Sequence, residues 1–481
     1  MNNKLLNLII FLLIFFFGLF GLAKSSWTAT IQAASCSQAD VQAAITATSA
    51  GGTVTVPAGT CTWNTAITID KGLSLIGAGS GAGGTTIKGS KDNLIIYSPD
   101  DLSANLLFRI SAFKFDLDHQ PIHGLQLYAS DMYGGPVLYQ KKIRVDHNVF
   151  VNLNVTSTQW KYIMTSGVRG VVDNNTFGDS FYPFRSATSY FSDTPPRTCY
   201  SGCREWQQTE GIVFGQTDNN MWFEDNDITI SDHGQGLVIT DGQEGQRCGF
   251  RYNTVHIGST GYSQLFDWHG NYGDGDGSTY STMGVEVYGN NFLGGAGAAS
   301  DGRGGRSFLF LNNYTGSFSF VIYEEHAASG TPITYTGPNP PQYSQDVNGT
   351  YFFGNRTNYT GTNISVDINE TCGLCIPGAL VAGKNFFTDT STPGVSCGPL
   401  ANRPESCTTG QAYWATNQSA CTDLTNYVGA GTGKTPLSGT FYRCAANAWD
   451  GGSTLLTYPH PLRGGDGDTT PPAAPTGLSV Q

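Results

Sequence analysis

A short motif recurs along the chain and limits the folds open to it. Each copy is a strand-like run, an Asn, and an apolar or β-branched residue two positions after that Asn, as in residues 143–150 and 171–177. Spacings between successive copies vary from 22 to 51 residues. The motif asparagines are Asn148, Asn175, Asn226, Asn253, Asn290, Asn312, Asn355 and Asn385. Such a period is typical of a β-solenoid whose repeats are single turns, double turns or turns with an inserted loop.

Elementary packing supports the same interpretation. A strand of three to five residues cannot bury its apolar face alone, whereas stacked copies form a continuous interior. Asn tolerates a left-handed backbone bend between strands, and stacked amide side chains form hydrogen-bonded ladders. The alternative, an antiparallel sandwich, needs two-residue hairpin turns at short intervals, and these are scarce. We therefore predict an all-β fold built from stacked parallel strands.

The first 23 residues are expected to be a secretory signal peptide. Lys4 supplies the positive start, residues 5–20 are almost entirely Leu, Ile and Phe, and Gly21-Leu22-Ala23 resembles a cleavage site. A membrane anchor is the alternative, because the apolar run is nearly long enough to span a bilayer. The small residues directly after the run favour cleavage. No later stretch is apolar enough to span a membrane, so we expect a secreted or cell-surface protein.

Four segments are predicted along the chain. After the signal peptide (1–23), the repeats occupy residues 36–390. Residues 391–463 lose the period and gain cysteines, and residues 464–481 combine a Gly/Pro linker with the possible start of a truncated fibronectin type III-like module. A short amphipathic helix over Ser37–Ala50, with Ser37 as its N-cap, is expected to cover the open end of the solenoid.

The eleven cysteines of an exported chain indicate disulfides. Cys36 and Cys61 bracket the N-terminal cap, six cysteines crowd the C-terminal part, and Cys248 is the candidate odd thiol. A zinc site is the alternative for Cys372, Cys375, Cys397 and Cys407.

Charge narrows the range of partners. The formal net charge is −12, which argues against nucleic acid or an anionic membrane as a partner. A strongly acidic polymer is also disfavoured unless Ca²⁺ or a local basic cleft compensates. No organic cofactor is expected.

With these residues in view, the chain resembles the pectin-lyase-like superfamily, and more narrowly the exported bacterial β-helix repeat proteins of unassigned function. Residues 51–63 and 71–79 look like its N-terminal coil, and the Asn repeats look like its body. The segments Tyr413–Thr416 and Tyr458–Leu462 are similar to those of the exported proteins. The resemblance spans residues 36–463 and implies a right-handed, single-stranded parallel β-helix with a helical N-cap. It leaves the activity open, because the superfamily includes lyases, hydrolases, esterases and adhesins.

Two aspartates are candidate calcium ligands. Val145-Asp146-His147 resembles a segment of the pectate lyases in which the Asp binds Ca²⁺, and Asp173 occupies the same place in the next repeat. Two carboxylates one strand spacing apart (~4.8 Å) would repel each other unless a hard cation bridged them. The alternative is that both are turn residues with local hydrogen bonds. The arginine motif of the lyases is missing.

A second acidic group is compatible with glycoside hydrolysis, which uses paired carboxylates. It consists of Asp225, Asp227, Asp232, His233 and Asp241, and we take Asp232 and Asp241 as candidate catalytic residues. The paired Asp and the basic element of polygalacturonases are missing, so solvated loop carboxylates are the alternative.

A third group is the preferred site. It includes Arg247, Arg251, Asp267, Trp268, His269, Tyr272, Arg303 and Arg306. The candidate catalytic residues of this group are Asp267, His269, Arg303 and Arg306, with His269 as a base. The candidate substrate-binding residues are Trp268, Tyr272, Arg247 and Arg251, and the rings of Trp268 and Tyr272 are expected to stack on sugars. Arg303 or Arg306 is expected to bind carboxylate or hydroxyl groups. Ion pairs with Asp267, Glu286 and Asp301, and a hydrogen-bonded turn at His269, are the alternatives.

The sequence therefore predicts a secreted polysaccharide-active protein, a lyase or a glycoside hydrolase that uses a groove along the solenoid. The alternative is a non-catalytic glycan-binding, adhesive or structural surface protein that can self-associate.

Overall fold

The computed structural model describes most of the chain between residues 29 and 464. The gaps within this range are residues 92, 102, 129–139, 158, 167, 181–182, 188–213, 215–219, 232, 234–237, 244–246, 259–262, 271–280, 325–345 and 370–377. In the described part the protein is all-β, with three long, entirely parallel sheets and one α-helix, α2 (Gln38–Ala47). The predicted signal peptide and the residues after 464 lie outside the described part.

The parallel sheets are named A, B and C here. Sheet A has 12 strands: β1 (Thr30–Gln32), β2 (Thr53–Val56), β5 (Ser74–Gly77), β8 (Phe108–Ser111), β11 (Gln140–Asp146), β14 (Val168–Asp173), β17 (Met221–Glu224), β20 (Cys248–Arg251), β24 (Met283–Tyr288), β27 (Arg306–Phe310), β30 (Thr350–Phe353) and β33 (Phe386–Thr388). Sheet B has 10 strands: β3 (Gly59–Trp63), β6 (Thr85–Gly89), β9 (Phe113–Asp116), β12 (Val149–Val151), β15 (Thr176–Ser180), β18 (Asp227–Ser231), β21 (Thr254–Gly258), β25 (Asn291–Gly294), β28 (Asn313–Tyr314) and β31 (Arg356–Thr357). Sheet C has 11 strands: β4 (Ile67–Ile69), β7 (Ile95–Tyr97), β10 (Leu125–Tyr128), β13 (Ile163–Ser166), β16 (Phe184–Ala187), β19 (Thr240–Gln243), β22 (Ser263–Gln264), β23 (Phe266–Trp268), β26 (Ala296–Gly302), β29 (Ser317–Ile322) and β32 (Val366–Ile368).

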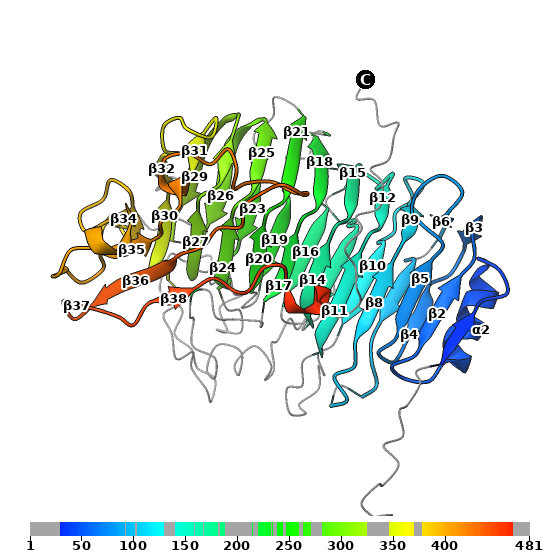
Figure 1. Ribbon diagram of the computed structural model, residues 1–481. Coiled ribbons are helices and arrows are strands. Elements are labelled where there is room, and N and C mark those ends of the chain that lie inside the picture. Colours follow the sequence, from blue (N-terminus) through cyan, green and yellow to red (C-terminus); the bar gives the residue numbers. More distant parts are fainter. Residues whose placement is uncertain are drawn as a thin grey trace, which may run out of the picture.

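The chain visits the three sheets in rotation. From β2 onward a strand of sheet A is followed by one of sheet B, then one of sheet C, and each new strand pairs with its counterpart from the previous round. The strands therefore stack from α2 at one end to β33 near the other (Figure 1). Every pair in the three sheets is parallel, an arrangement compatible with a β-helix or solenoid.

The interior is built from the motif positions. The residues two positions after the first six motif asparagines are fully buried: Phe150, Phe177, Ile228, Val255, Phe292 and Tyr314. Rings stack from one round to the next, with centroids 4.9 Å apart for Phe150 and Phe177 and 4.7 Å apart for Phe292 and Tyr314. The sequence-based expectation that these positions point inward is confirmed.

Seven motif asparagines, from Asn148 to Asn355, form one continuous ladder. At each step the Oδ1 of one Asn accepts both the backbone N–H and the side-chain amide of the Asn before it, over 2.9–3.2 Å. Every member is at most 2% exposed. This Asn ladder connects the turns that join sheet A to sheet B, each of which contains two residues.

Two details of the motif differ from the expectation. The left-handed residue of each turn is the one before the Asn, as in Tyr252 (φ 55°) and Leu311 (φ 52°), and not the Asn itself. The ladder Asn therefore stabilises a neighbour's conformation instead of adopting it. Asn385 also lies outside the ladder, because it precedes strand β33 and accepts the N–H of Val381 within its own turn.

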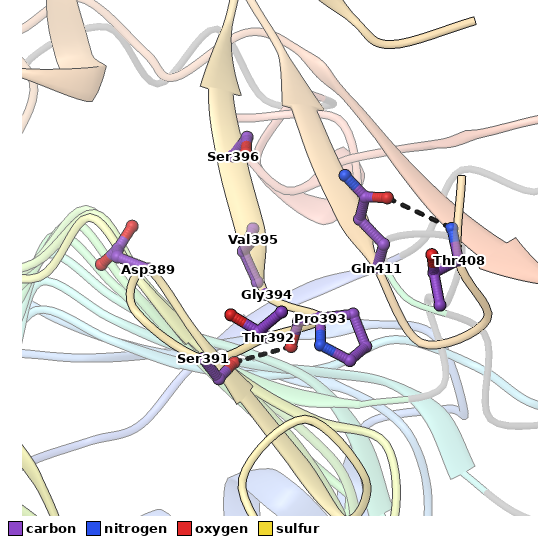
Figure 2. Close-up of a pocket in the computed structure, with 9 residues that line it drawn as sticks. All are labelled: Asp389, Ser391, Thr392, Pro393, Gly394, Val395, Ser396, Thr408 and Gln411. Atoms are coloured by element: carbon purple, nitrogen blue, oxygen red, sulfur yellow. Dashed lines mark hydrogen bonds between the residues drawn. The ribbon is translucent and has the colours of Figure 1, made fainter. Parts of the chain in front are cut away.

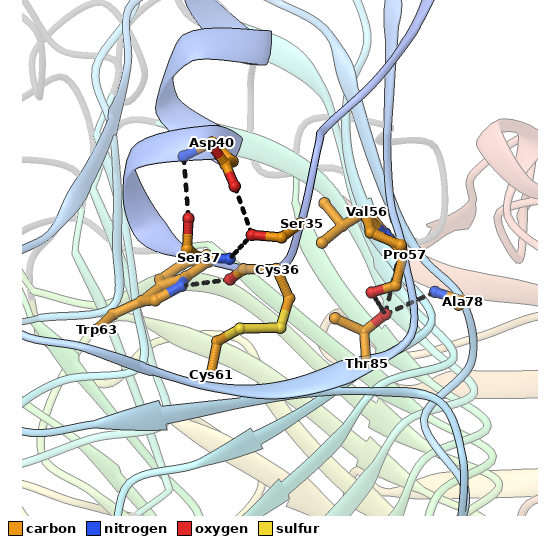
Figure 3. The surroundings of a disulfide bond; sticks show 10 residues. All are labelled: Ser35, Cys36, Ser37, Asp40, Val56, Pro57, Cys61, Trp63, Ala78 and Thr85. Atoms are coloured by element: carbon orange, nitrogen blue, oxygen red, sulfur yellow. Dashed lines mark hydrogen bonds between the residues drawn. A yellow bond between two sulfur atoms is a disulfide. The ribbon is translucent and has the colours of Figure 1, made fainter.

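Helix α2 lies against the first strands. Ser37 caps it by accepting the N–H of Asp40, and Val41, Ala44 and Ile45 are buried, as the sequence predicts. Gln42 donates to the carbonyl and accepts from the N–H of Thr68 (both 3.1 Å), on the edge strand β4 of sheet C. A disulfide joins Cys36, just before the helix, to Cys61 on edge strand β3, and Trp63 donates to the carbonyl of Cys36 (Figure 3).

The C-terminal residues fold back along sheet A. Strands β34 (Val395–Gly398), β35 (Ala412–Ala415), β36 (Thr440–Ala445), β37 (Ala448–Trp449) and β38 (Ser453–Thr454) form a five-stranded sheet. Phe310 and Phe353 of sheet A pack against Trp414 and Phe441 of this region in a second apolar cluster. The chain then runs back across β27, β24 and β20 toward β14 (Figure 1). From β14 to β30 sheet A is thus buried on both faces, which explains fully buried runs such as that of β17.

Three disulfides brace the described chain. Besides Cys36–Cys61, they are Cys397–Cys421 and Cys407–Cys444. The alternative zinc site is wrong for Cys397 and Cys407, because both are oxidised with other partners; Cys372 and Cys375 lie outside the described residues. Cys248 is a buried thiol outside any disulfide. No helix of the described residues has the length and hydropathy needed to cross a bilayer.

The ladder leads to a stability prediction. Asn253 makes hydrogen bonds to Asn226 and Asn290 and to the carbonyls of Phe223 and Arg251. Replacing it by Ala leaves several buried backbone groups unpaired, so Asn253→Ala is expected to lower the free energy of unfolding by about 2–4 kcal/mol. Denaturant titration measures this change. Asn417→Ala, at an exposed position, is the control, and equal losses in the two variants would contradict a special role for the ladder.

Candidate functional site

The long connections of the chain are concentrated at one corner. From β11 onward the turns from sheet A to sheet B have two residues, whereas the connections from sheet C to sheet A include residues 129–139, 188–220, 269–282, 323–349 and 369–385. In repeat proteins, insertions confined to one type of turn mark one face, and that face is often the binding face. A candidate site is therefore expected where the strands of sheet C end.

Three aspartates line up across neighbouring strands of sheet C. Asp241 on β19 is the register partner of Asp267 on β23, which is in turn the register partner of Asp301 on β26. We call these three residues the carboxylate row. The row thus combines Asp241, a member of the second acidic group, with Asp267, a member of the third group. They meet because the chain between them returns to the same level of sheet C. The side chain of Asp241 is outside the described part.

Arg303 links the two described carboxylates of the row. It lies in the three-residue turn between β26 and β27, with Nη2 2.5 Å from Oδ1 of Asp267 and Nε 3.4 Å from Oδ2 of Asp301. Asp301 is only 1% exposed, whereas the side chains of Asp267 and Arg303 are 14% and 15% exposed. Gln264 also donates to Oδ2 of Asp301 at 2.5 Å. Among these described side chains, solvent therefore reaches Asp267 of the row and its partner Arg303.

His269 lies beside the row. Its Nε2 is 3.6 Å from Oδ2 of Asp267, and its side chain is 18% exposed. Its backbone N–H donates to the carbonyl of Gly242, and its carbonyl accepts the N–H of Thr282 just before β24. Both ends of the connection 269–282 are thus held together at the base of the site. The predicted grouping of Asp267, His269 and Arg303 is present.

Trp268 does not have the predicted role. Because strand residues alternate between faces, Trp268 points into the interior while Asp267 and His269 point outward. It is 2% exposed and its ring lies 5.4 Å from that of Phe266, so it cannot stack on a sugar. Tyr272, the second predicted stacking residue, lies outside the described residues, as does Asp232.

The other predicted arginines lie at strands of sheet A and not on sheet C. Arg247 and Arg306 are at the start of strands β20 and β27 of sheet A; Arg247 is buried, and Arg306 donates to the carbonyl of Asn348 at 3.1 Å. Arg251 lies at the opposite end of β20 and is fully buried. It pairs with Glu224 at 2.7 Å and donates to the carbonyls of Leu456 and Thr457. The partners of Arg251 are thus other parts of this protein, at the corner between sheets A and B.

The second acidic group is also dispersed. Asp227 is exposed on sheet B and pairs with His256 at 3.2 Å, while His233 approaches Asp179 at 3.4 Å. Asp225 lies in a turn between sheets A and B, where it contacts the C-terminal residues. Only Asp241 contributes to the carboxylate row.

The proposed calcium ligands have cationic partners. Asp146 and Asp173 are register partners on β11 and β14, as expected. Arg109 forms two 2.7 Å hydrogen bonds to Asp146, and Arg144 forms bonds of 3.1 and 3.2 Å to Asp173. Burial alone would raise the pKa of Asp146, but Arg109, His147 and Arg144 outweigh it and hold that pKa well below its usual range. These carboxylates do not fit a Ca²⁺ site, because guanidinium groups occupy the positions next to them. In the described residues, no group of three or more His, Cys, Asp or Glu side chains is arranged to hold a metal ion.

Sequence reasoning missed the partner of the remaining carboxylates of sheet A. Residues 455–464, called here the C-terminal strap, lie across the ends of β14, β17 and β20. Arg463 reaches Asp173 at 3.3 Å, Glu224 at 2.8 Å and Asp225 at 2.6 Å. Tyr458 donates to Asp225 at 2.7 Å, and the N–H of His460 donates to Glu224 at 2.9 Å. The sequence contains the Tyr-Pro-His-Pro-Leu segment, but it does not indicate which residues that segment contacts.

The strap leads to a pH prediction. Burial tends to raise the pKa of Glu224, but Arg251 and Arg463 lower it from 4.5 to about 2. Ionised Glu224 therefore contributes stability that is present above pH 4.5 and is lost as the pH falls toward 2. At ~1.4 kcal/mol per pKa unit, the contribution is at most about 3 kcal/mol.

Denaturant titrations at several pH values test this contribution. The free energy of unfolding of the unmodified chain should fall more steeply below pH 4.5 than that of Glu224→Gln. Glu405→Gln, at an exposed position, should behave like the unmodified chain. Parallel curves for the chain and Glu224→Gln would contradict the assignment.

Comparisons with known proteins add little. No family model and no curated protein matches the chain. Among solved structures, it is similar to "Geobacillus virus E2 - ORF18", with 12% sequence identity and a TM-score of 0.28, over 61% of this chain and 58% of that one. A likeness at this level carries no argument about function.

Proposed function

We propose that sheets A, B and C form a right-handed, single-stranded parallel β-helix and that α2 is its N-terminal cap. The rotation of the chain through three parallel sheets supports the first part. The contact of Gln42 with β4 and the Cys36–Cys61 bridge to β3 support the second, because both engage edge strands that would otherwise offer free backbone groups. Residues 36–390 and 391–463 correspond to the β-helix and the cysteine-rich region, downstream of a signal peptide that directs secretion.

We further propose that the protein acts on polysaccharide and that the carboxylate row is its active site. The observation that carries this proposal is the register of Asp241, Asp267 and Asp301 at the corner with the long connections. Neighbouring strands are ~4.8 Å apart, so adjacent members of the row have a backbone spacing near the ~5–5.5 Å separation of retaining glycosidase carboxylates. Asp241 and Asp301, two spacings apart, are near the upper end of the ~6.5–9.5 Å range of inverting enzymes.

Within this proposal the residues have distinct tasks. Asp267, which solvent reaches, donates or accepts the proton at the glycosidic oxygen, and a neighbouring carboxylate of the row acts on the anomeric carbon or its attacking water. Arg303 holds Asp267 and Asp301 in place and offers N–H donors to sugar hydroxyls or carboxylates. His269 orients Asp267. Paired carboxylates favour hydrolysis over elimination.

The alternative is a non-catalytic glycan-binding, adhesive or structural surface protein. The observation in its favour is that Arg303 already forms ion pairs with both described carboxylates of the row, as expected for a structural ion-pair network. Binding without turnover, or self-association independent of glycan, would support this function.

Turnover assays separate the two proposals. The secreted protein is incubated with a panel of neutral and uronic polysaccharides, and both reducing ends and unsaturated products are measured. We expect reducing ends without unsaturated product, and a fall of at least ~100-fold in rate for Asp267→Asn and for Asp301→Asn. Asp227→Asn, on sheet B, is the matched control and should retain full activity.

Thermal unfolding of each variant shows whether the fold survives. If unsaturated product is found, the reaction is an elimination by a lyase and not hydrolysis. Unchanged rates in folded Asp267→Asn would overturn the assignment of the site, and binding without any product would favour the non-catalytic function.

A further inference from the structure

A polar pocket lies apart from the residues of the carboxylate row. It has a volume of about 310 Å³ and lies where the chain leaves sheet A for the C-terminal sheet. Its lining residues are Asp389, Ser391, Thr392, Pro393, Gly394, Val395, Ser396, Thr408 and Gln411. Ligand pockets in proteins typically measure ~300–1,000 Å³, so this one has room for a small ligand such as one sugar unit.

The pocket presents a matched acceptor and donor. Asp389 uses Oδ2 to accept the N–H of Gly354 at 3.0 Å, which leaves Oδ1 for a ligand. Gln411 accepts the N–H of Thr408 through Oε1 at 3.3 Å, so its amide orientation is fixed with Nε2 as the outward donor. Among the described residues, Nε2 of Gln411 has no hydrogen-bond partner. Figure 2 shows Asp389 and Gln411 on opposite sides of the pocket, with the amide nitrogen directed away from Thr408.

The floor and rim complete the pattern. Thr392 and Pro393 lie between Asp389 and Gln411 (Figure 2), and the Pro ring offers C–H groups to a ligand. Ser396, Thr392 and Thr408 are exposed and contribute hydroxyl groups. The backbone here is well fixed, because the hydroxyl of Ser391 accepts the N–H of Thr388 and donates to the carbonyl of Pro393. A carboxylate, an amide and hydroxyls around an apolar patch suit a ligand with several hydroxyl groups and an apolar face.

We propose that this pocket binds one uncharged sugar residue of a glycan, as a site separate from the carboxylate row. Asp389 accepts hydrogen bonds from two neighbouring hydroxyls, Gln411 donates to a hydroxyl or ring oxygen, and Pro393 contacts the C–H face of the ring. The single carboxylate, with no cationic side chain in the lining, selects against uronic acids. The proposal rests on the proposed function in that the ligand is a glycan, but it does not require turnover.

Ligand-observed NMR tests the site directly. The probes are methyl α-D-glucopyranoside, methyl β-D-galactopyranoside and D-galacturonic acid, each titrated into the full-length secreted protein. We expect millimolar binding of at least one neutral glycoside and at least ~10-fold weaker binding of galacturonic acid. Asp389→Asn and Gln411→Glu, which preserve side-chain shape, should each weaken the neutral glycoside at least ~5-fold. Asp423→Asn, half-buried in the same region and outside the pocket, should leave binding unchanged.

Two results would overturn the proposal. One is that neither neutral glycoside binds at 50 mM, a concentration about ten times a dissociation constant of ~5 mM. The other is that the folded variants and the unmodified chain bind equally. Comparing one variant from each site in both assays distinguishes the pocket from the carboxylate row. Asp389→Asn should retain turnover of short soluble oligosaccharides, and Asp267→Asn should retain the NMR response. In the unmodified chain, turnover without an NMR response rejects only the pocket, and an NMR response without turnover rejects only the row.

Discussion

The Asn ladder is the interaction on which the rest of the structure depends. Each buried amide closes a two-residue turn and forces the residue before it into a left-handed conformation, even where that residue is Tyr252 or Leu311. Such a conformation costs roughly 1–2 kcal/mol for a residue with a side chain. The hydrogen bonds of the ladder offset this cost, because an unpaired buried amide would cost about as much again. Within the ladder, every turn from sheet A to sheet B therefore keeps the same two-residue length, and insertions are accepted elsewhere.

This constraint gives the faces of the molecule different roles. Sheet A carries carboxylates at its strand ends, but the C-terminal strap covers them and Arg463 forms ion pairs with three of them. The outer side of sheet A is also packed against Trp414 and Phe441. Sheet C has the long connections at its strand ends and an acidic row that solvent reaches through Asp267. The same residue type thus stabilises the chain on one sheet and is available for chemistry on another.

The sequence predicts local periodicity well and long-range docking poorly. The Asn spacing identifies the stacked strands, and the residue two positions later identifies the interior, as with Phe150 and Phe177. Asn385 shares the motif but not the ladder, because the motif alone does not record on which side of a strand the Asn falls. Trp268 looked like a binding residue, but its neighbours already fix it inward by alternation. Arg463 lies more than 230 residues from Glu224 and Asp225, so only tertiary structure brings them together.

The site itself shows why register matters more than proximity in the sequence. Asp225, Asp227 and Asp241 are close in the chain, yet they end on a turn, on sheet B and on sheet C. Asp241, Asp267 and Asp301 are far apart in the chain, yet they are register partners, because each round of the chain returns to the same level of sheet C. Strand ends arranged in this way repeat along the stacking direction, and an extended polymer lying along that direction would pass them in sequence and reach the solvent-accessible Asp267. A row of this kind therefore suits a polysaccharide better than a small substrate, which would engage one strand end at a time.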